Sequence, residues 1–162
     1  MAKHTHEFEF EVLEQELDMN EADRQLLTRA RNTTPQAYAP YSRFHVAAAA
    51  RLKNGEIVTS TNQENASYPV GICAERTLLG TLSSLYPNLP VDTIAITYVN
   101  HATGNSHSPA SPCGLCRQSL YEYEQRVSHP IRLILAGATG KVLIIHQVRD
   151  LLPFGFGPDD LK

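Results

Sequence analysis

All three cysteines of this 162-residue chain lie in two short segments, Gly71-Ile72-Cys73-Ala74-Glu75-Arg76 and Ser111-Pro112-Cys113-Gly114-Leu115-Cys116-Arg117-Gln118. Cys113 and Cys116 are three positions apart, so one helical turn places both sulfur atoms on the same face. Pro112 just before them suits the first position of a helix. Cys73 precedes a helix-forming run from Ala74 to Leu85. The pattern predicts two helices whose N-termini meet at a cluster of sulfur atoms.

Three thiolates supply three of the four tetrahedral positions of zinc, and an open fourth position is typical of a catalytic site. Glu75, two residues after Cys73, can face a water molecule at that position and carry its proton as general acid and base. A structural zinc would need a fourth ligand, which His101 or His107 in the loop before Pro112 can in principle supply. The cysteines could also form a redox Cys-x-x-Cys or serve as buried small side chains. We expect a catalytic zinc.

Five short motifs resemble those of the small, homotetrameric class of cytidine deaminases. Two are the cysteine segments, and the other three complete the family order. They are Tyr38-Ala39-Pro40-Tyr41-Ser42-x-Phe44-x-Val46, Asn62-x-Glu64-Asn65-Ala66-Ser67-Tyr68 and Leu151-Leu152-Pro153-x-x-Phe156-Gly157-Pro158. The resemblance covers residues 38–161. A lone Cys-x-x-Cys would be weak evidence, but five motifs in order are specific.

The resemblance implies a three-layer α/β/α cytidine-deaminase-like fold with a mixed five-stranded sheet. Hydrophobic patterning agrees, because helices alternate with strands after an opening hairpin at Asn54-Gly55. We expect one catalytic domain at residues 20–162, with no internal repeat. The expected strands are 44–52, 56–62, 91–99, 131–136 and 142–146, and the expected cysteine-bearing helices are 73–85 and 113–124.

Residues 1–19 form an N-terminal extension that the resemblance does not cover. Phe8, Phe10 and Val12 alternate strictly with acidic residues, a pattern that predicts one apolar face of a short strand. The strand is expected either at the edge of the sheet, as an arm packed on the domain, or as an arm that reaches a neighbouring subunit.

The resemblance implies the hydrolytic deamination of cytidine and deoxycytidine to uridine and deoxyuridine, with release of ammonia. Such an enzyme is a hydrolase that acts on the C–N bond of a cyclic amidine and serves pyrimidine salvage. It would hold one Zn²⁺ per subunit on Cys73, Cys113 and Cys116, with Glu75 as the catalytic group. The family also implies a homotetramer with shared active sites.

By the same resemblance, Asn62 and Glu64 hydrogen-bond the ribose hydroxyls, while Phe44 and Phe156 pack on the pyrimidine and the sugar. The tail and Tyr68 reach into the pocket of a neighbouring subunit. A carboxylate accepts a hydrogen bond from a sugar hydroxyl but repels a phosphate, and the chain has no glycine-rich phosphate loop. A nucleoside is therefore favoured over a nucleotide.

The base itself would contact Ala66 and the backbone at Ala74 and Ser111.

Three thiolates on Zn²⁺ leave a net negative charge, which makes the metal a poorer Lewis acid. The two helix N-termini offset part of that charge. Arg76 can donate hydrogen bonds to the sulfur atoms, and Gln118, one turn beyond the cysteines, can act similarly.

Charge and composition exclude several classes of protein. The net charge of −3 leaves no basic surface for nucleic acid. No apolar run is long enough to cross a membrane, and no secretory segment follows Met1. The odd number of cysteines, none outside the two motifs, argues against a disulfide framework. We expect a cytoplasmic protein that binds neither nucleic acid nor membrane.

Three other functions compete with this interpretation. A deaminase of cytosine-containing nucleoside analogues, of the blasticidin type, shares the three-cysteine site, although the intact ribose motif at 62–68 argues against it. A nucleic-acid-editing deaminase is disfavoured by the acidic charge balance. A zinc-stabilised binding module without turnover would unfold on treatment with a chelator and show no activity. The loop 101–111 is longer than usual for the family, and its role is open.

Overall fold

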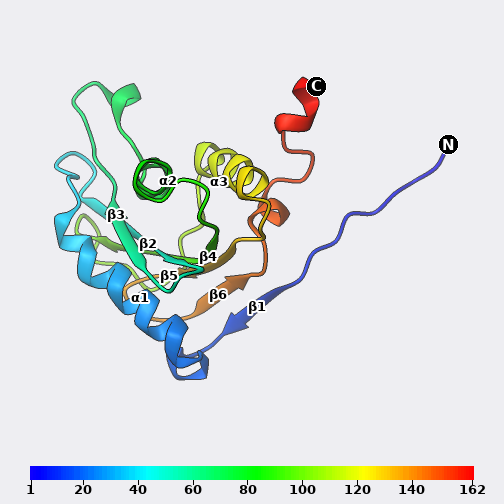
Figure 1. Cartoon of the computed structure of the whole chain (residues 1–162). Coiled ribbons are helices and arrows are strands. Elements are labelled where there is room, and N and C mark those ends of the chain that lie inside the picture. The colour runs from blue at the N-terminus through cyan, green and yellow to red at the C-terminus, as the bar shows by residue number, and fades with distance from the viewer.

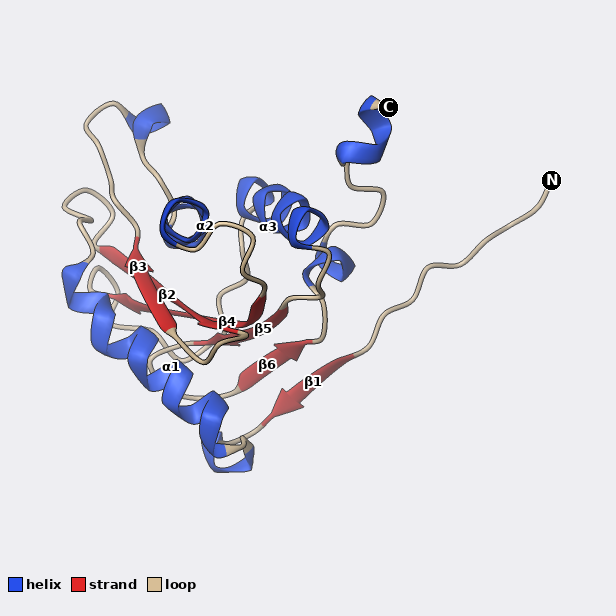
Figure 2. Cartoon of the chain, viewed as in Figure 1, coloured by secondary structure: helices blue, strands red, loops and turns tan.

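A computed structural model describes residues 1–162. The elements form three layers, with the sheet in the middle, α1 on one face, and α2 and α3 on the other (Figures 1 and 2). In chain order the strands and α-helices are β1 (Phe10–Leu13), α1 (Glu21–Thr33), β2 (Phe44–Leu52), β3 (Ile57–Thr61), α2 (Ala74–Leu85), β4 (Val91–Asn100), α3 (Gly114–Val127), β5 (Arg132–Ala136) and β6 (Val142–Ile145). None of the helices combines the length and the apolar character that a membrane crossing requires.

The sheet is mixed, as expected, but it has six strands in the order β1-β6-β5-β4-β2-β3. Only β4 and β5 pair in parallel; every other neighbouring pair is antiparallel. The expectation of five strands was wrong because β1, inside the predicted extension, pairs with β6, with Phe10 opposite Ile145. The alternating segment is therefore an edge strand over 10–13, and the residues before it run away from the body (Figure 1).

Strand alternation divides the core into two clusters on opposite faces of the sheet. Ala48 and Ala50 of β2 belong to the larger cluster, together with Leu78 of α2. Ala49 belongs to the smaller cluster, with Leu26 of α1. These alanines are fully buried, and their small side chains let helices pack closely on both faces of β2.

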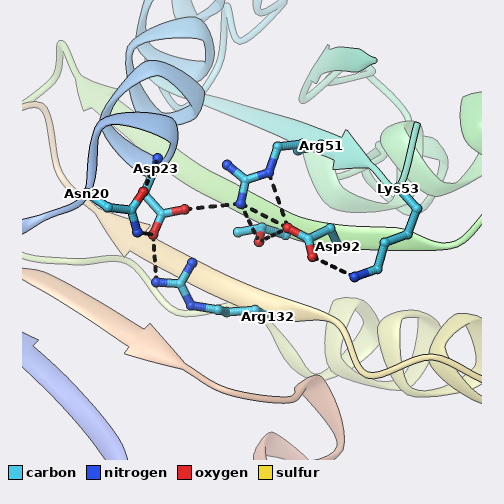
Figure 3. Close-up of polar contacts among 7 residues, drawn as sticks. Asn20, Asp23, Arg51, Lys53, Asp92 and Arg132 are labelled. Carbon is cyan, nitrogen blue, oxygen red and sulfur yellow. Dashed lines mark hydrogen bonds and ion pairs between the residues drawn. The ribbon is translucent and has the colours of Figure 1, made fainter. Parts of the chain in front are cut away.

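The start of α1 is joined to the sheet by a network of charges, shown in Figure 3. Asn20 caps the helix by accepting a hydrogen bond from the backbone N–H of Asp23 at 2.9 Å. The Asp23 carboxylate, 1% exposed, lies 3.2 Å from Arg51 and 2.7 Å from Arg132. Arg51 also reaches Asp92 at 2.9 Å. These contacts tie α1 to β2, β4 and β5.

The network lowers the pKa of both carboxyl groups. Burial acts to raise the pKa of Asp23, but hydrogen bonds and charge from Arg132, with help from Asn20 and Arg51, outweigh it. For Asp92, burial is likewise outweighed by Arg51 and Lys53, and the pKa falls to about 2. Both groups stay ionised at neutral pH and support the fold in that form.

Candidate functional site

The topology brings two helix N-termini to one end of the sheet. β3 and β4 both run antiparallel to β2, so both strands finish at the same end of the sheet, and α2 and α3 begin there. Cys73 is the N-cap of α2 and Cys113 is the N-cap of α3. Neither thiol makes a capping hydrogen bond, which leaves both sulfur atoms free for a ligand. α3 begins one residue later than predicted, and Pro112 lies outside it.

The three sulfur atoms have the spacing that one metal ion requires. The Sγ atoms of Cys73 and Cys113 are 3.9 Å apart, and those of Cys113 and Cys116 are 3.5 Å apart. Tetrahedral zinc with Zn–S bonds of about 2.3 Å places sulfur atoms about 3.8 Å from one another. All three lie within 4.8 Å of one another. The cluster therefore fits zinc.

No histidine or carboxylate completes this cluster. The ring of His101 stacks edge-on against His45 with centroids 4.8 Å apart. His107 Nδ1 lies 2.7 Å from Thr139 Oγ1. The two histidines considered as fourth ligands of a structural zinc are thus engaged elsewhere, and the protein supplies three ligands only, as a catalytic site requires.

The electrostatics of the thiols also favour a cation. The hydrogen bond from Cys116, with smaller help from Cys113 and Arg76, lowers the pKa of Cys73 to about 6. The same contact, together with burial and the nearby charge of Glu75, raises the pKa of Cys116. The thiolate of Cys73 therefore forms readily, and its negative charge opposes the ionisation of Cys116. A divalent cation removes this opposition, because it stabilises all three thiolates together.

Glu75 is a buried carboxyl group without a cationic partner. It is 5% exposed, and it takes part in none of the ion pairs of the structure. Burial raises its pKa, and its own backbone N–H and the thiol of Cys116 oppose the rise only in part. A carboxyl group whose pKa is raised in this way is suited to hold and release a proton during a reaction.

A pocket of about 480 Å³ opens in front of Glu75. This volume is in the range of pockets that hold small organic ligands. Its only charged lining residues are Glu64 and Glu75; no lysine, arginine or histidine reaches it. Cys116 is fully buried behind the pocket. Among the predicted site residues, those that line it are Phe44, Asn62, Glu64, Tyr68, Cys73, Ala74, Glu75, Ser111 and Cys113.

Asn62 and Glu64 line the pocket in different ways. The Asn62 side chain accepts from the N–H of Val46 at 2.8 Å and donates to the carbonyl of Phe44 at 2.9 Å, so β2 fixes its orientation. Glu64 accepts from the N–H of Tyr41 at 2.9 Å and from the hydroxyl of Ser42. Burial acts to raise the pKa of Glu64, but these hydrogen bonds lower it. Glu64 is therefore a fixed, ionised acceptor.

Two aromatic residues, Phe44 and Tyr68, line the pocket. Phe44 stacks on Tyr98 with ring centroids 4.6 Å apart, which holds its ring as one wall. Tyr68 is 75% exposed, and its ring meets that of Tyr41 edge-on, with ring centroids 5.9 Å apart. Phe44 is thus rigidly packed, whereas Tyr68 projects from the rim.

Two predicted contact residues lie outside the pocket lining. Ala66 is exposed on the loop before α2. Phe156 is 57% exposed in the tail, and its carbonyl accepts a hydrogen bond from Gln118 at 2.7 Å. Gln118 therefore holds the tail and makes no hydrogen bond to sulfur. Arg76 lines a groove between α2 and α3, and it acts on Cys73 through its charge.

Arg117 is a contributor to the site that the motif analysis quoted but did not interpret. Its side chain reaches back along α3 and donates to the carbonyl of Pro112 at 2.9 Å and to that of Leu151 at 3.3 Å. Long helical side chains point toward the N-terminus of their helix, so an arginine one turn after Cys113 is suited to this contact. That geometry is the signal that could have identified it.

The layered sheet and the sulfur cluster at two helix N-termini define an α/β/α protein with a three-cysteine metal site. A family model described as "Cytidine and deoxycytidylate deaminase zinc-binding region" matches residues 20–129. The cytidine deaminase of Halalkalibacterium halodurans is 36% identical over 141 residues, 86% of this chain and 98% of that protein. That of Mycobacterium tuberculosis (strain H37Rv) is 38% identical over 128 residues, 77% of this chain and 82% of that protein.

Solved structures of cytidine deaminases are also similar to this chain. The crystal structure of cytidine deaminase from Burkholderia pseudomallei has a TM-score of 0.69 and 33% identity, over 85% of this chain and 100% of that chain. A more distant relative, the blasticidin-S deaminase of Bacillus cereus, is 30% identical over 119 residues, 71% of this chain and 79% of that protein. This chain belongs to the cytidine and deoxycytidylate deaminase family. The expected family and fold class are confirmed.

Proposed function

We propose that this protein catalyses the hydrolytic deamination of cytidine and deoxycytidine to uridine and deoxyuridine, with release of ammonia. One observation carries the proposal: the buried Glu75 carboxyl group stands beside a three-sulfur cluster that has no fourth protein ligand, at a pocket of about 480 Å³. Membership of the family and the relatives named cytidine deaminase support it.

Cys73, Cys113 and Cys116 would hold one Zn²⁺ per subunit. When bound, zinc supplies a Lewis acid that activates a water molecule at neutral pH. The N-termini of α2 and α3 offset the negative charge of the thiolates, because each helix end behaves as roughly half a positive charge. Arg76 adds a full positive charge near Cys73.

Glu75 moves the protons of the reaction. It takes a proton from the attacking water as the new C4–O bond forms, and it delivers a proton to N3 of the base. It then takes the proton of the new C4 hydroxyl group and hands it to the departing amine as the C4–N bond breaks, so that C4 keeps a carbonyl oxygen and ammonia leaves. The raised pKa of Glu75 supports this role, because the group can hold a proton between the two transfers.

Glu64 accepts a hydrogen bond from a ribose hydroxyl, and Asn62 lies beside it on the sugar side. Phe44 packs on the pyrimidine ring, and the backbone at Ala74 and Ser111 contacts the base edge. The pocket presents two carboxylates and no cationic side chain, so it repels a phosphate group. A neutral nucleoside is therefore the substrate, in preference to cytidine monophosphate.

The same family membership leads us to propose a homotetramer with shared active sites. Phe156 and Tyr68 are 57% and 75% exposed, which supports a role for both against a neighbouring subunit. Ala66, exposed on the same loop as Tyr68, would come into contact with substrate through that arrangement. Sedimentation that found only monomers in an active preparation would remove the roles of Phe156, Tyr68 and Ala66.

We further propose that residues 20–162 form the catalytic domain, with residues 1–19 as an extension that adds β1 to the sheet. Three free cysteines suit a reducing compartment, which supports a cytoplasmic location. A nucleoside deaminase in that compartment would serve pyrimidine salvage. Activity of the chain without residues 1–19 would test the boundary.

An ultraviolet assay with cytidine, deoxycytidine and cytidine monophosphate side by side tests the activity. We expect turnover of both nucleosides, with kcat/KM for the monophosphate on the order of a hundredfold lower because of charge repulsion. A chelator should abolish turnover and zinc should restore it. The metal-free protein should stay folded, because neither core cluster depends on the three cysteines. Unfolding on chelation with no turnover in any state would identify a binding module instead.

The relative that deaminates blasticidin S favours a second candidate, a deaminase of cytosine-containing nucleoside analogues. The same assay with blasticidin S separates the two functions. A kcat/KM for blasticidin S above that for cytidine would replace our proposal, and we expect the opposite order.

A further inference from the structure

The loop between β4 and α3 begins with a stretch, residues 101–110, whose role the motifs leave unexplained. Near its end, Ala110 and Ser111 line the pocket, and Pro112 separates them from Cys113. Its middle is held against the turn between β5 and β6. Ser106 is 6% exposed, and its carbonyl accepts the N–H of Ala138 at 2.8 Å. The loop therefore packs on a second segment of the fold before it reaches the site.

The turn is shaped to receive the loop. A Cβ atom on Gly137 would lie 2.1 Å from the carbonyl oxygen of Ser106, and one on Gly140 would lie 2.3 Å from that of His107. Gly140 also has a φ of +92°, which favours glycine. The side chains of His107 and Thr139 meet at 2.7 Å. We call the contact between residues 106–107 and 137–140 the latch.

The latch is anchored in the body of the protein. The carbonyl of Gly137 accepts hydrogen bonds from Arg31 of α1 at 2.9 Å and from the hydroxyl of Thr97 of β4 at 3.0 Å. On the loop side, the hydroxyl of Ser106 accepts the N–H of Asn100 at 2.8 Å. Both halves of the latch are thus fixed to elements of the three-layer core.

A stiff segment runs from the latch to the metal ligand. Residues 108–112, Ser-Pro-Ala-Ser-Pro, contain two prolines, which fix their own φ angles and restrict the residue before each of them to extended backbone. Arg117 holds the far end by its hydrogen bond to the carbonyl of Pro112 at 2.9 Å. We call this segment the strut. Its middle, Ala110 and Ser111, is the wall of the pocket.

We propose that the latch and the strut are positioning elements that fix the Ala110–Ser111 wall in place before the nucleoside binds. This inference rests on the proposed function. A wall that is already ordered loses little conformational entropy on binding, so the substrate binds more tightly than it would to a mobile loop. Cys113 stays placed by α3 and Arg117, so the effect falls on substrate affinity and spares the chemical step.

Pro109→Gly tests the strut, because it frees the backbone without touching the latch, the core or a side chain of the pocket. We expect KM for cytidine to rise about tenfold, the factor that corresponds to about 1.4 kcal/mol, while kcat stays within about twofold. Zinc content and melting temperature should match those of the parent. Ala102→Gly is the matched control, since it adds a glycine to the same loop on the other side of the latch and should leave KM unchanged.

Gly137→Ala tests the latch by steric conflict with Ser106. We expect faster hydrogen exchange of the amides at 105–111 and the same rise in KM. If this variant fails to fold, the pair Thr139→Val and His107→Ala replaces it. Each change then raises KM, and the double variant raises it no further than the stronger single change. Fully additive effects would contradict a shared contact.

Affinity for uridine, measured by calorimetry, is a readout that needs no turnover. It should weaken in Pro109→Gly by the same factor as KM. The inference is overturned if Pro109→Gly matches Ala102→Gly in KM and in uridine affinity while the parent is active, or if kcat and stability fall as KM rises. A parent protein that neither deaminates cytidine nor binds uridine would overturn the proposed function, and the inference with it.

Discussion

Two of the three buried carboxyl groups, Asp23 and Glu75, lie on opposite faces of the same sheet, and their surroundings shift their pKa values in opposite directions. Asp23, in the first turn of α1, lies between Arg51 and Arg132, and its pKa is lowered (Figure 3). Glu75, at the start of α2, has no cationic partner, and burial raises its pKa. The carboxylate of Asp23, which is matched by cations, stabilises the fold, whereas the ionised carboxylate of Glu75, which is unmatched, lowers the free energy of unfolding. Such a cost is typical of a group kept for proton transfer.

The strongest way to break this comparison is Glu75→Gln. Turnover of cytidine should fall by roughly a thousandfold, because the proton carrier is lost. The pKa of Glu75 in the folded state lies above its unfolded value, so its ionised form costs free energy at pH 7, and that cost fades as pH falls. The metal-free variant should therefore melt at a higher temperature than the metal-free parent.

Glu122→Gln, on the exposed face of α3, is the control and should change neither activity nor melting. Steady-state kinetics and calorimetry measure both effects. A Glu75→Gln protein that keeps most of its turnover would refute the role of this residue.

Asp23→Asn probes the matched carboxylate. It leaves two arginines beside a neutral amide, and we expect a loss of about 3 kcal/mol in the free energy of unfolding. The kcat per folded molecule should not change, because the network lies on the opposite face from the pocket. Asp159→Asn, at an exposed ion pair with Lys162, is the control and should be neutral in urea titrations. A variant of Asp23 that is fully stable but inactive would reverse the comparison.

Acid should weaken the fold through the same network. Asp92 has a pKa of about 2 and Asp23 is also lowered, whereas an unfolded aspartate titrates near pH 3.9. The stabilisation is complete above the unfolded value and is lost as pH falls through the folded one. Urea midpoints of the metal-free protein should therefore decline from about pH 4 to pH 2. Asp92→Asn should flatten that decline, and an unchanged slope would argue against the network as its source.

The smallest expected effect concerns Arg76, which lies in α2 next to Glu75 and lowers the pKa of Cys73 through its charge. Arg76→Gln should lower kcat by roughly fivefold, because its charge no longer offsets the thiolates, while zinc content stays near full. Elemental analysis and kinetics on one preparation test both parts. Unchanged kinetics would show that the helix N-termini alone suffice.

The two segments that carry the site could be predicted from sequence because the geometry within each of them is local, whereas the meeting of Cys73 with Cys113, 40 positions away, was expected from the resemblance. Spacing within one helical turn sets Cys113 relative to Cys116, and Glu75 follows Cys73 by two residues, so short segments carry the arrangement. Gln118 could not be assigned in this way. Its partner is the carbonyl of Phe156, and no local pattern relates a helix to a tail 38 residues away.

The fold was predictable to the level of its layers and missed one strand. The alternation of Phe8, Phe10 and Val12 indicates a strand, but the identity of its partner depends on which edge of the sheet lies free. Only the structure shows that β6 is that edge. The latch was hidden for the same reason, since Gly137 and Gly140 look like ordinary turn glycines until the loop packed on them is seen.

The pairing of β1 with β6 has a practical consequence for anyone who shortens this chain. A protein cut back to residue 20, where the family match begins, would leave Val142–Ile145 as the outermost strand, with one row of backbone groups unpaired and Leu143 uncovered. Bare strands of this kind recruit other chains and promote aggregation. The first nineteen residues would then matter for solubility, even where catalysis does without them.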